Sequence, residues 1–120
     1  MAANFQECLP LSPATLHILL SLAADDLHGY AIMQEIARHS EGTYRIGPGT
    51  LYDNLQKMIK REWVEELGRR PGDEDPRRRY YRLTSAGRGV LEAETARLAE
   101  VVREARSRLQ KTGMAKPRRA

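Results

Sequence analysis

The chain has 120 residues, of which 41% are hydrophobic and 30% are charged, and its formal net charge is +4. This length suits one domain with a modest core and argues against a deep, enclosed active site. Because the sequence has no run of about 18 apolar residues, no signal-peptide pattern and a single cysteine, Cys8, we expect a cytoplasmic protein with no membrane contact, internal disulfide or cysteine-based zinc site.

The positive charge is concentrated in the later part of the sequence. Up to Tyr44 there is one basic residue against five acidic ones, a balance of −4, whereas from Arg45 onward 19 basic residues stand against 11 acidic ones, a balance of +8. A basic surface is typical of nucleic-acid binding, although an anionic membrane or an acidic protein would satisfy the same charge. The later part is therefore expected to meet an anion.

The first predicted helix begins after Ser12. A serine hydroxyl can accept a bond from a free amide at a helix start, and Pro13 is tolerated at the first helical position. We expect the helix to run to about Ala24. Its apolar residues lie all round the cylinder, which predicts that it is covered on more than one face.

A second, amphipathic helix is expected from about Gly29 to His39, after a break at Asp25 to Leu27. Its apolar face is expected to hold Tyr30, Met33, Ile36 and Ala37. None of the three histidines has the spacing of a metal-ligand motif, so no metal site is expected.

The third helix is expected over about Pro48 to Arg61, where the apolar residues Leu51, Leu55, Met58 and Ile59 repeat at helical spacing. It follows two glycines and a proline in three positions. Gly47, Pro48 and Gly49 are expected to let the chain turn tightly between the second and third helices. They also leave the start of the third helix open to a phosphate group.

The opposite face of the third helix is polar and basic. It carries Asp53, Gln56, Lys57 and Lys60, with Thr50, Asn54 and Arg61 on one flank and Tyr52 on the other. Short donors and acceptors mixed with cations suit a DNA major groove, where base edges form hydrogen bonds and phosphates line both rims. An ordinary solvated helix face has the same composition, and for an isolated helix it is the better interpretation. The position of this helix within the predicted fold therefore decides between a solvated face and a DNA-binding face.

From Trp63 onward the sequence predicts a β-hairpin and then one long helix. WVEEL and RRYYRLT are typical of extended segments, and the Pro, Gly and Asp content of RRPGDEDPR between them is typical of an exposed loop. The last helix is expected to begin after a cap at Thr84 and to run to about Lys111. Its apolar residues alternate at spacings of four and three, which indicates a coiled-coil-like seam.

These elements predict a mainly α fold with a small β-hairpin, a winged helix-turn-helix followed by a C-terminal dimerisation helix. The expected domains are a DNA-binding domain over residues 9–84, the dimerisation helix over 85–111 and a basic tail, expected to be disordered, over 112–120. The seam is weak alone, so the dimer core should combine the first and last helices, where a pocket could open across the two-fold axis. Its expected residues are Leu16, Leu19, Leu20, Leu91, Leu98, Val102 and Leu109.

Three stretches, in this order, resemble the PadR family of bacterial transcriptional regulators. They are LSPATLHILLSLAADDLHGYAIMQEI, GPGTLYDNLQKM and RRRYYRLTSAGRGVL, and HGY, TLY and YYRLT followed by AG are their most specific parts. The resemblance covers roughly residues 9 to 109, and the single last helix is similar to the short members of the family. It implies a homodimer, operator DNA bound as two half-sites, and repression that a small molecule relieves in some members.

The resemblance also implies roles for single residues. Thr50 and Tyr52 would contact the DNA backbone, and Lys57 would lie along the groove. The wing would carry Arg77, Arg78 and Arg79. Trp63 stands where the family usually has a glycine after the third helix. Because a left-handed tryptophan costs roughly 1 to 2 kcal/mol, this helix end is expected to be built differently.

The expected function is that of a sequence-specific DNA-binding transcriptional regulator, a dimeric repressor with no cofactor and no enzymatic activity. The sequence has no positioned nucleophile and base, no carboxylate pair and no metal motif of the kind a hydrolase needs. The expected DNA contacts are Thr50, Tyr52, Asn54, Gln56, Lys57, Lys60, Arg61, Arg77, Arg78 and Arg79. The alternative is a winged-helix module whose basic face docks an acidic protein partner.

Overall fold

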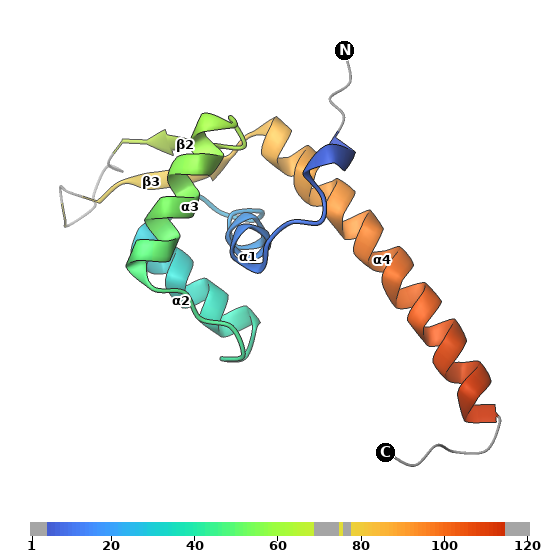
Figure 1. The fold of residues 1–120 in the computed structure, drawn as a ribbon. Coiled ribbons are helices and arrows are strands. Elements are labelled where there is room, and N and C mark those ends of the chain that lie inside the picture. Colours follow the sequence, from blue (N-terminus) through green and yellow to red (C-terminus); the bar gives the residue numbers. More distant parts are fainter. Residues whose placement is uncertain (1–4, 69–74, 76–77, 115–120) are drawn as a thin grey trace.

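The computed structural model of the chain describes residues 5–68, 75 and 78–114 and confirms a mainly helical fold with a small sheet (Figure 1). Its elements in chain order are η1 (Phe5–Cys8), α1 (Pro13–Ser21), β1 (Leu27–His28), α2 (Gly29–His39), α3 (Pro48–Lys60), β2 (Val64–Leu67), β3 (Tyr80–Leu83) and α4 (Ser85–Met114). The helix α1 contacts α2, α3 and α4 and lies between the α2–α3 pair and α4.

The start of α1 is built as the sequence predicts. The Ser12 hydroxyl accepts a hydrogen bond from the Thr15 amide at 3.2 Å, and Pro13 occupies the first turn. The helix ends at Ser21, three residues before the predicted end. Its Ile18 and Leu19 side chains have no exposed surface, which follows from the contacts with three helices and confirms that α1 is covered on more than one face.

In α2 the buried residues are Gly29, Ile32 and Ile36, so one part of the predicted apolar face is wrong. Tyr30 is 61% exposed. Residues two positions apart on a helix do not share a face, and the i, i+4 pair Ile32 and Ile36 takes the inward side. Tyr30 therefore points to solvent from the first turn of α2.

The helices α2 and α3 end in the same way, with a left-handed glutamate. Glu62 has a φ of 63°, and the Trp63 amide after it donates to the Met58 carbonyl at 2.9 Å. This is a Schellman ending, in which the left-handed position is usually glycine. Glu62 thus adopts the left-handed conformation and Trp63 does not, so this helix end is built differently from a glycine ending at Trp63, as expected.

The turn between α2 and α3 is not made by the glycines that the sequence suggested. Its left-handed residues are Glu41, with a φ of 52°, and Gly42, with a φ of 79°. Gly47 has a φ of −87° and a ψ of 172°, an extended conformation open to any residue. Gly47 serves as the N-cap of α3 instead, without a side-chain hydrogen bond.

The sheet has three antiparallel strands in the order β1-β3-β2, one more than the predicted hairpin. The extra strand, β1, pairs Leu27 with Tyr81 and His28 with Tyr80. Beside it, the Arg82 guanidinium bonds the Asp26 carboxylate at 2.9 Å. The first half of the chain is thereby joined to the base of the wing.

The core lies where α1, α2 and α3 meet the sheet and the start of α4. The predicted inner face of α3 is confirmed, since Leu51 and Leu55 are fully buried and Met58 is 2% exposed. The buried apolar residues are Ile18, Leu19, Leu22, Ile32, Ile36, Leu51, Leu55, Met58, Trp63, Val64, Tyr81, Leu83, Val90 and Leu91.

The helix α4 begins at Ser85 and is capped by Thr84, whose hydroxyl accepts from the Gly87 amide at 3.0 Å and donates to the Glu62 carbonyl at 2.6 Å. The helix continues to Met114, three residues beyond its predicted end. Only its first part joins the core, and from residue 99 to 111 every residue is exposed. Although α4 is long, neither it nor any other helix in the described ranges is apolar enough to cross a bilayer.

Candidate nucleic-acid interface

The outward face of α3 presents six of the predicted contact residues to solvent. Tyr52 is 44% exposed. The other exposed members are Thr50, Gln56, Lys57, Lys60 and Arg61. The Arg61 guanidinium carbon lies 4.9 Å from the centre of the Trp63 ring, a cation–π contact that holds this cation at the end of the helix. The face is polar and basic over the whole length of α3.

Asn54 differs from the other predicted contacts because it is half-buried and bound within the protein. Its side-chain amide donates to the Thr50 carbonyl at 2.8 Å, and its side-chain oxygen accepts from the Thr15 hydroxyl at 3.3 Å. Thr15 in turn accepts from the Ser12 hydroxyl at 3.0 Å. In this conformation Asn54 joins α3 to the start of α1.

The N-terminus of α3 is open, as the sequence predicts. No side chain caps it, and a β-carbon added at Gly47 or Gly49 would meet no atom within 4 Å. The first amides of a helix lack partners within the helix, and the helix dipole is positive at this end. The arrangement favours an anionic group such as a phosphate.

A surface groove of about 370 Å³ connects α2 and α3 with the base of the wing. The side chain of Tyr52 reaches across to Gly29 in this groove, with its Cζ atom 2.9 Å from where a β-carbon of Gly29 would lie. The groove is lined by His28, Gly29, Tyr30, Tyr52, Asp75, Arg78, Arg79 and Tyr81. Tyr30 was missed because a helical pattern with Met33 and Ile36 placed it in the core.

Two of the three predicted wing arginines can be placed. Arg78 and Arg79 are exposed just before β3, whereas Arg77 lies outside the described residues. Arg79 forms an exposed ion pair with Glu66, with its Nε atom 3.5 Å from the carboxylate. Exposed pairs of this kind contribute little energy, so Arg79 can exchange Glu66 for a phosphate at small cost.

Tyr81 forms the buried floor of the groove. Burial raises the pKa of its hydroxyl, and the nearby Glu66 carboxylate and Tyr52 raise it further, against the lowering effect of Arg79. The hydroxyl is therefore neutral at physiological pH and adds no negative charge to a surface that would meet phosphates.

The predicted dimerisation residues fall into three groups, which are buried, half-buried and exposed. Leu19 and Leu91 are buried within the core of the same chain, at 0% and 8% exposure. Leu16 and Leu98 are half-buried. Leu20 on α1 and Val101, Val102 and Leu109 on α4 are exposed. Val101 is an addition to the predicted seam.

The histidines His17 and His39 meet although they are 22 positions apart. The Nδ1 atom of His17 lies 2.9 Å from the Nε2 atom of His39, and the His17 ring stacks on Tyr44 with centroids 4.5 Å apart. Glu35 adds one carboxylate 3.9 Å from His39. Across the part of the chain that the structure describes, no group of three or more His, Cys, Asp or Glu residues is arranged to hold a metal.

Comparison with known sequences identifies one family over most of the chain. Residues 18–93 match the model of the transcriptional regulator PadR-like family. The protein called transcriptional regulator Rv3488, from Mycobacterium tuberculosis, is 38% identical over 89 residues, which cover 74% of this chain and 78% of the relative.

Solved structures share the fold at lower sequence identity. A PadR family transcription regulator from Clostridium difficile aligns with a TM-score of 0.68 and 20% identity, over 82% of this chain and 99% of that one. Bacillus subtilis PadR, solved in complex with operator DNA, aligns with a TM-score of 0.61 and 20% identity. That alignment covers 70% of this chain and 47% of that one.

Proposed function

Since the chain belongs to the PadR-like family of transcriptional regulators, we propose that it binds operator DNA as a homodimer and represses transcription until a small-molecule effector releases it. Members of this family are transcriptional regulators and not enzymes. The observation that carries the proposal is the exposed polar and basic face of α3 beside the arginines of the wing. A cytoplasmic location belongs to the same proposal.

Each α3 enters a major groove in this arrangement. Lys57, Lys60 and Arg61 neutralise phosphates along its rims, while Gln56 faces base edges. Thr50 and Tyr52 contact the backbone near the open start of α3. The structural similarity to a regulator solved with its operator supports this docking.

The wing, which is the β2–β3 hairpin, is proposed to make further contacts with the DNA beside those of α3. Arg78 and Arg79 stand at the base of the wing and line the groove with Tyr52. In the proposed arrangement they contact the DNA backbone next to the major groove. Contacts of this kind position the protein and make its affinity depend on salt, without reading sequence.

The second half of the proposal is that α4 forms the dimer, with residues 9–84 as the DNA-binding domain and 85–111 as the dimerisation helix. Val101, Val102 and Leu109 are 51%, 45% and 69% exposed, and Leu20 on α1 is 45% exposed. Exposed apolar side chains that gather into one patch often mark an interaction site, and three of these four lie on α4. Light scattering at micromolar concentration should give the mass of a dimer, and a monomer mass would contradict this half.

The decisive experiment measures fluorescence anisotropy with the DNA upstream of the chain's own gene, beside a shuffled duplex, across a salt series. We expect the native duplex to bind at least about a hundredfold more tightly, with two protomers per site. Equal and weak binding to both, together with a stoichiometric acidic protein in a pull-down, would favour the alternative of a protein-docking module. A selection of bound genomic fragments then decides between a protein-docking function and an operator located elsewhere in the genome.

A further inference from the structure

Glu94 is a buried carboxylate in the first third of α4, with 1% of its surface exposed. Its Oε2 atom accepts a hydrogen bond from the Leu11 amide at 3.0 Å, and its Oε1 atom accepts from Arg97 Nε at 2.6 Å. The hydrogen bond from Arg97 outweighs the effect of burial and, with the Leu11 amide, keeps the pKa of Glu94 below its ordinary value. Glu94 is therefore ionised at neutral pH.

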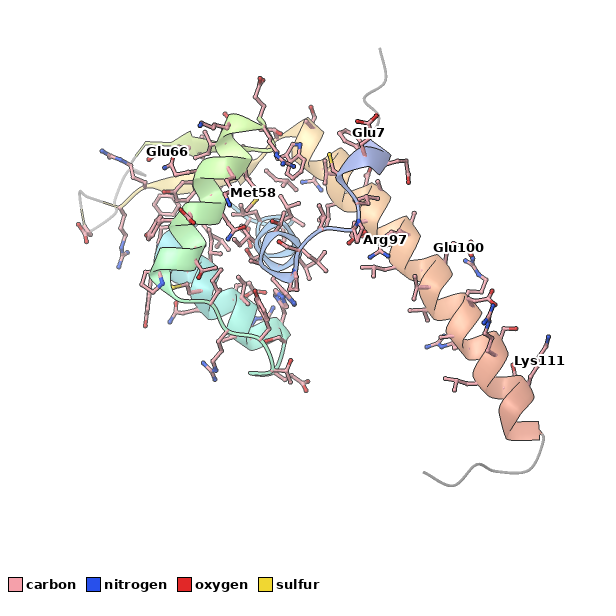
Figure 2. All side chains as sticks on the ribbon, viewed as in Figure 1. Glu7, Met58, Glu66, Arg97, Glu100 and Lys111 are labelled. Atoms are coloured by element: carbon pink, nitrogen blue, oxygen red, sulfur yellow. The ribbon has the colours of Figure 1, made fainter. Side chains whose placement is uncertain are left out.

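The Leu11 hydrogen bond joins α4 to a segment 83 positions earlier, the N-terminal strap of residues 5–12. The strap also contacts α4 at Gly89, where a β-carbon would lie 2.8 Å from the Cζ atom of Phe5. In Figure 2 Arg97 lies beside the loop that leads from η1 to α1. The strap thus crosses α4 at two points and continues directly into the Ser12 cap of α1.

Glu94 is also the last buried residue of α4 within the described part of the chain. The helix continues for 20 residues to Met114, a length of about 30 Å at 1.5 Å per residue. A tilt of about 10° at Glu94 would move the far end by about 5 Å, more than the 3.4 Å step between base pairs along a DNA strand. A small change in the direction of α4 at Glu94 therefore produces a large displacement at the end of the helix.

A carboxylate at a buried position such as that of Glu94 carries a cost in desolvation. Taking a charge out of water is unfavourable, and well-packed apolar residues of similar volume often stabilise a protein equally or better. An apolar side chain would fill the space, but it could not hold the Leu11 amide at a set distance and direction. What the carboxylate adds is a directed link between the strap and α4.

We propose that Glu94 is a positioning residue that fixes the direction of α4 relative to α3, and so the half-site spacing that the dimer accepts. The part about spacing rests on the proposed function as a dimeric DNA-binding protein. The part about direction concerns a single chain and holds with or without DNA.

The test uses the full chain with spin labels at two exposed positions, Gln56 on α3 and Gln110 on α4, after Cys8→Ser removes the native thiol. Labelled protein is diluted with an excess of unlabelled protein, so that only distances within one chain are measured. Glu94→Met removes the acceptor at nearly constant volume, and Glu94→Gln keeps an oxygen for the Leu11 amide. Glu100→Met is the matched control, because Glu100 pairs with Arg103 three residues later on the exposed part of α4.

We expect a narrow distance distribution in the wild type, a broader or shifted one in Glu94→Met, and wild-type distributions in Glu94→Gln and Glu100→Met. Operators with one base pair added or removed between the half-sites should bind the wild type less well, and Glu94→Met should reduce that discrimination roughly tenfold. A wild-type distribution in Glu94→Met would overturn the inference.

Two further outcomes can be distinguished from a failure of the inference about Glu94. If the wild type binds no duplex selectively, the proposed function fails, while the label distances still decide whether Glu94 sets the direction of α4. If Glu94→Met does not fold, amide exchange of the wild type decides instead. Protection of the Leu11 amide supports the link, and exchange at the rate of an exposed amide overturns it.

Discussion

The hydroxyl end of Tyr52 on α3 occupies the space that a β-carbon of Gly29 would need at the start of α2. The hydroxyl oxygen lies well inside contact distance of that position, and the ring carbon Cε1 is 3.3 Å from it. The HGY and TLY stretches of the sequence therefore meet in the folded chain. Because Gly29 has no side chain, the Tyr52 ring can pack against it at the edge of the proposed DNA-binding surface.

Gly29→Ala should displace Tyr52 while leaving the fold intact, because the clashing atoms are the far end of a side chain that can rotate away. If Tyr52 contacts the DNA backbone, the loss of one such hydrogen bond should weaken operator binding about tenfold. Tyr52→Ala should have a similar effect. In a double-mutant cycle measured by anisotropy, Gly29→Ala should cost nothing further once Tyr52 is Ala. Full additivity of the two losses would show that Gly29 acts elsewhere.

Gly87→Ala should destabilise the fold, because its β-carbon would run into the Trp63 carbonyl, whose carbon lies 2.9 Å from that position. Backbone cannot rotate away as Tyr52 can, so we expect a loss of about 3 kcal/mol in the free energy of unfolding. Gly49→Ala makes the same change in an α3 position with no atom within 4 Å. It should stabilise by about 0.5 to 1 kcal/mol. Urea unfolding of both variants tests the contrast, and equal effects would contradict it.

The stability of the protein should fall as the pH drops through the range in which histidine titrates. Burial lowers the pKa of His17 below the ordinary 6.5, and the neighbouring His39 lowers it further. Below about pH 6.5 the unfolded chain therefore takes up a proton at this position that the folded chain resists, so the contribution is complete above pH 6.5 and is lost on acidification. Unfolding free energies measured across this range should depend less on pH in His17→Gln. An unchanged pH dependence would remove His17 as a cause.

Most of the fold could be predicted because its elements carry local signals. Ser12 and Pro13 mark the start of α1, and Leu51, Leu55 and Met58 give α3 its buried face. The strand β1 carries no such signal, since Leu27 and His28 are too few to show alternation and become a strand only by pairing with β3. The left-handed Glu62 was equally hidden, because glutamate is not a residue that marks such a position.

The candidate site was predictable as a helix face and less so residue by residue. Lys57, Lys60 and Arg61 are exposed as expected, since their outward direction follows from the opposite apolar stripe. Asn54 shares their side of the wheel but reaches Thr15 of another helix, a contact that helical spacing cannot reveal. His17 with His39 and Leu11 with Glu94 are likewise pairs created by packing between distant segments.

Lys57→Ala should weaken binding to operator and shuffled DNA alike and should reduce the slope of log affinity against log salt by about 0.9, the share of one phosphate. The reason is that Lys57 is exposed in the middle of the proposed contact face. Lys111→Ala removes the same charge from the far end of α4, away from α3, and should leave the slope unchanged. Anisotropy titrations over a salt series compare the two variants. Equal slopes for wild type and Lys57→Ala would place Lys57 outside the interface, whereas equal reductions in both variants would mean that net charge, and not the face of α3, governs binding.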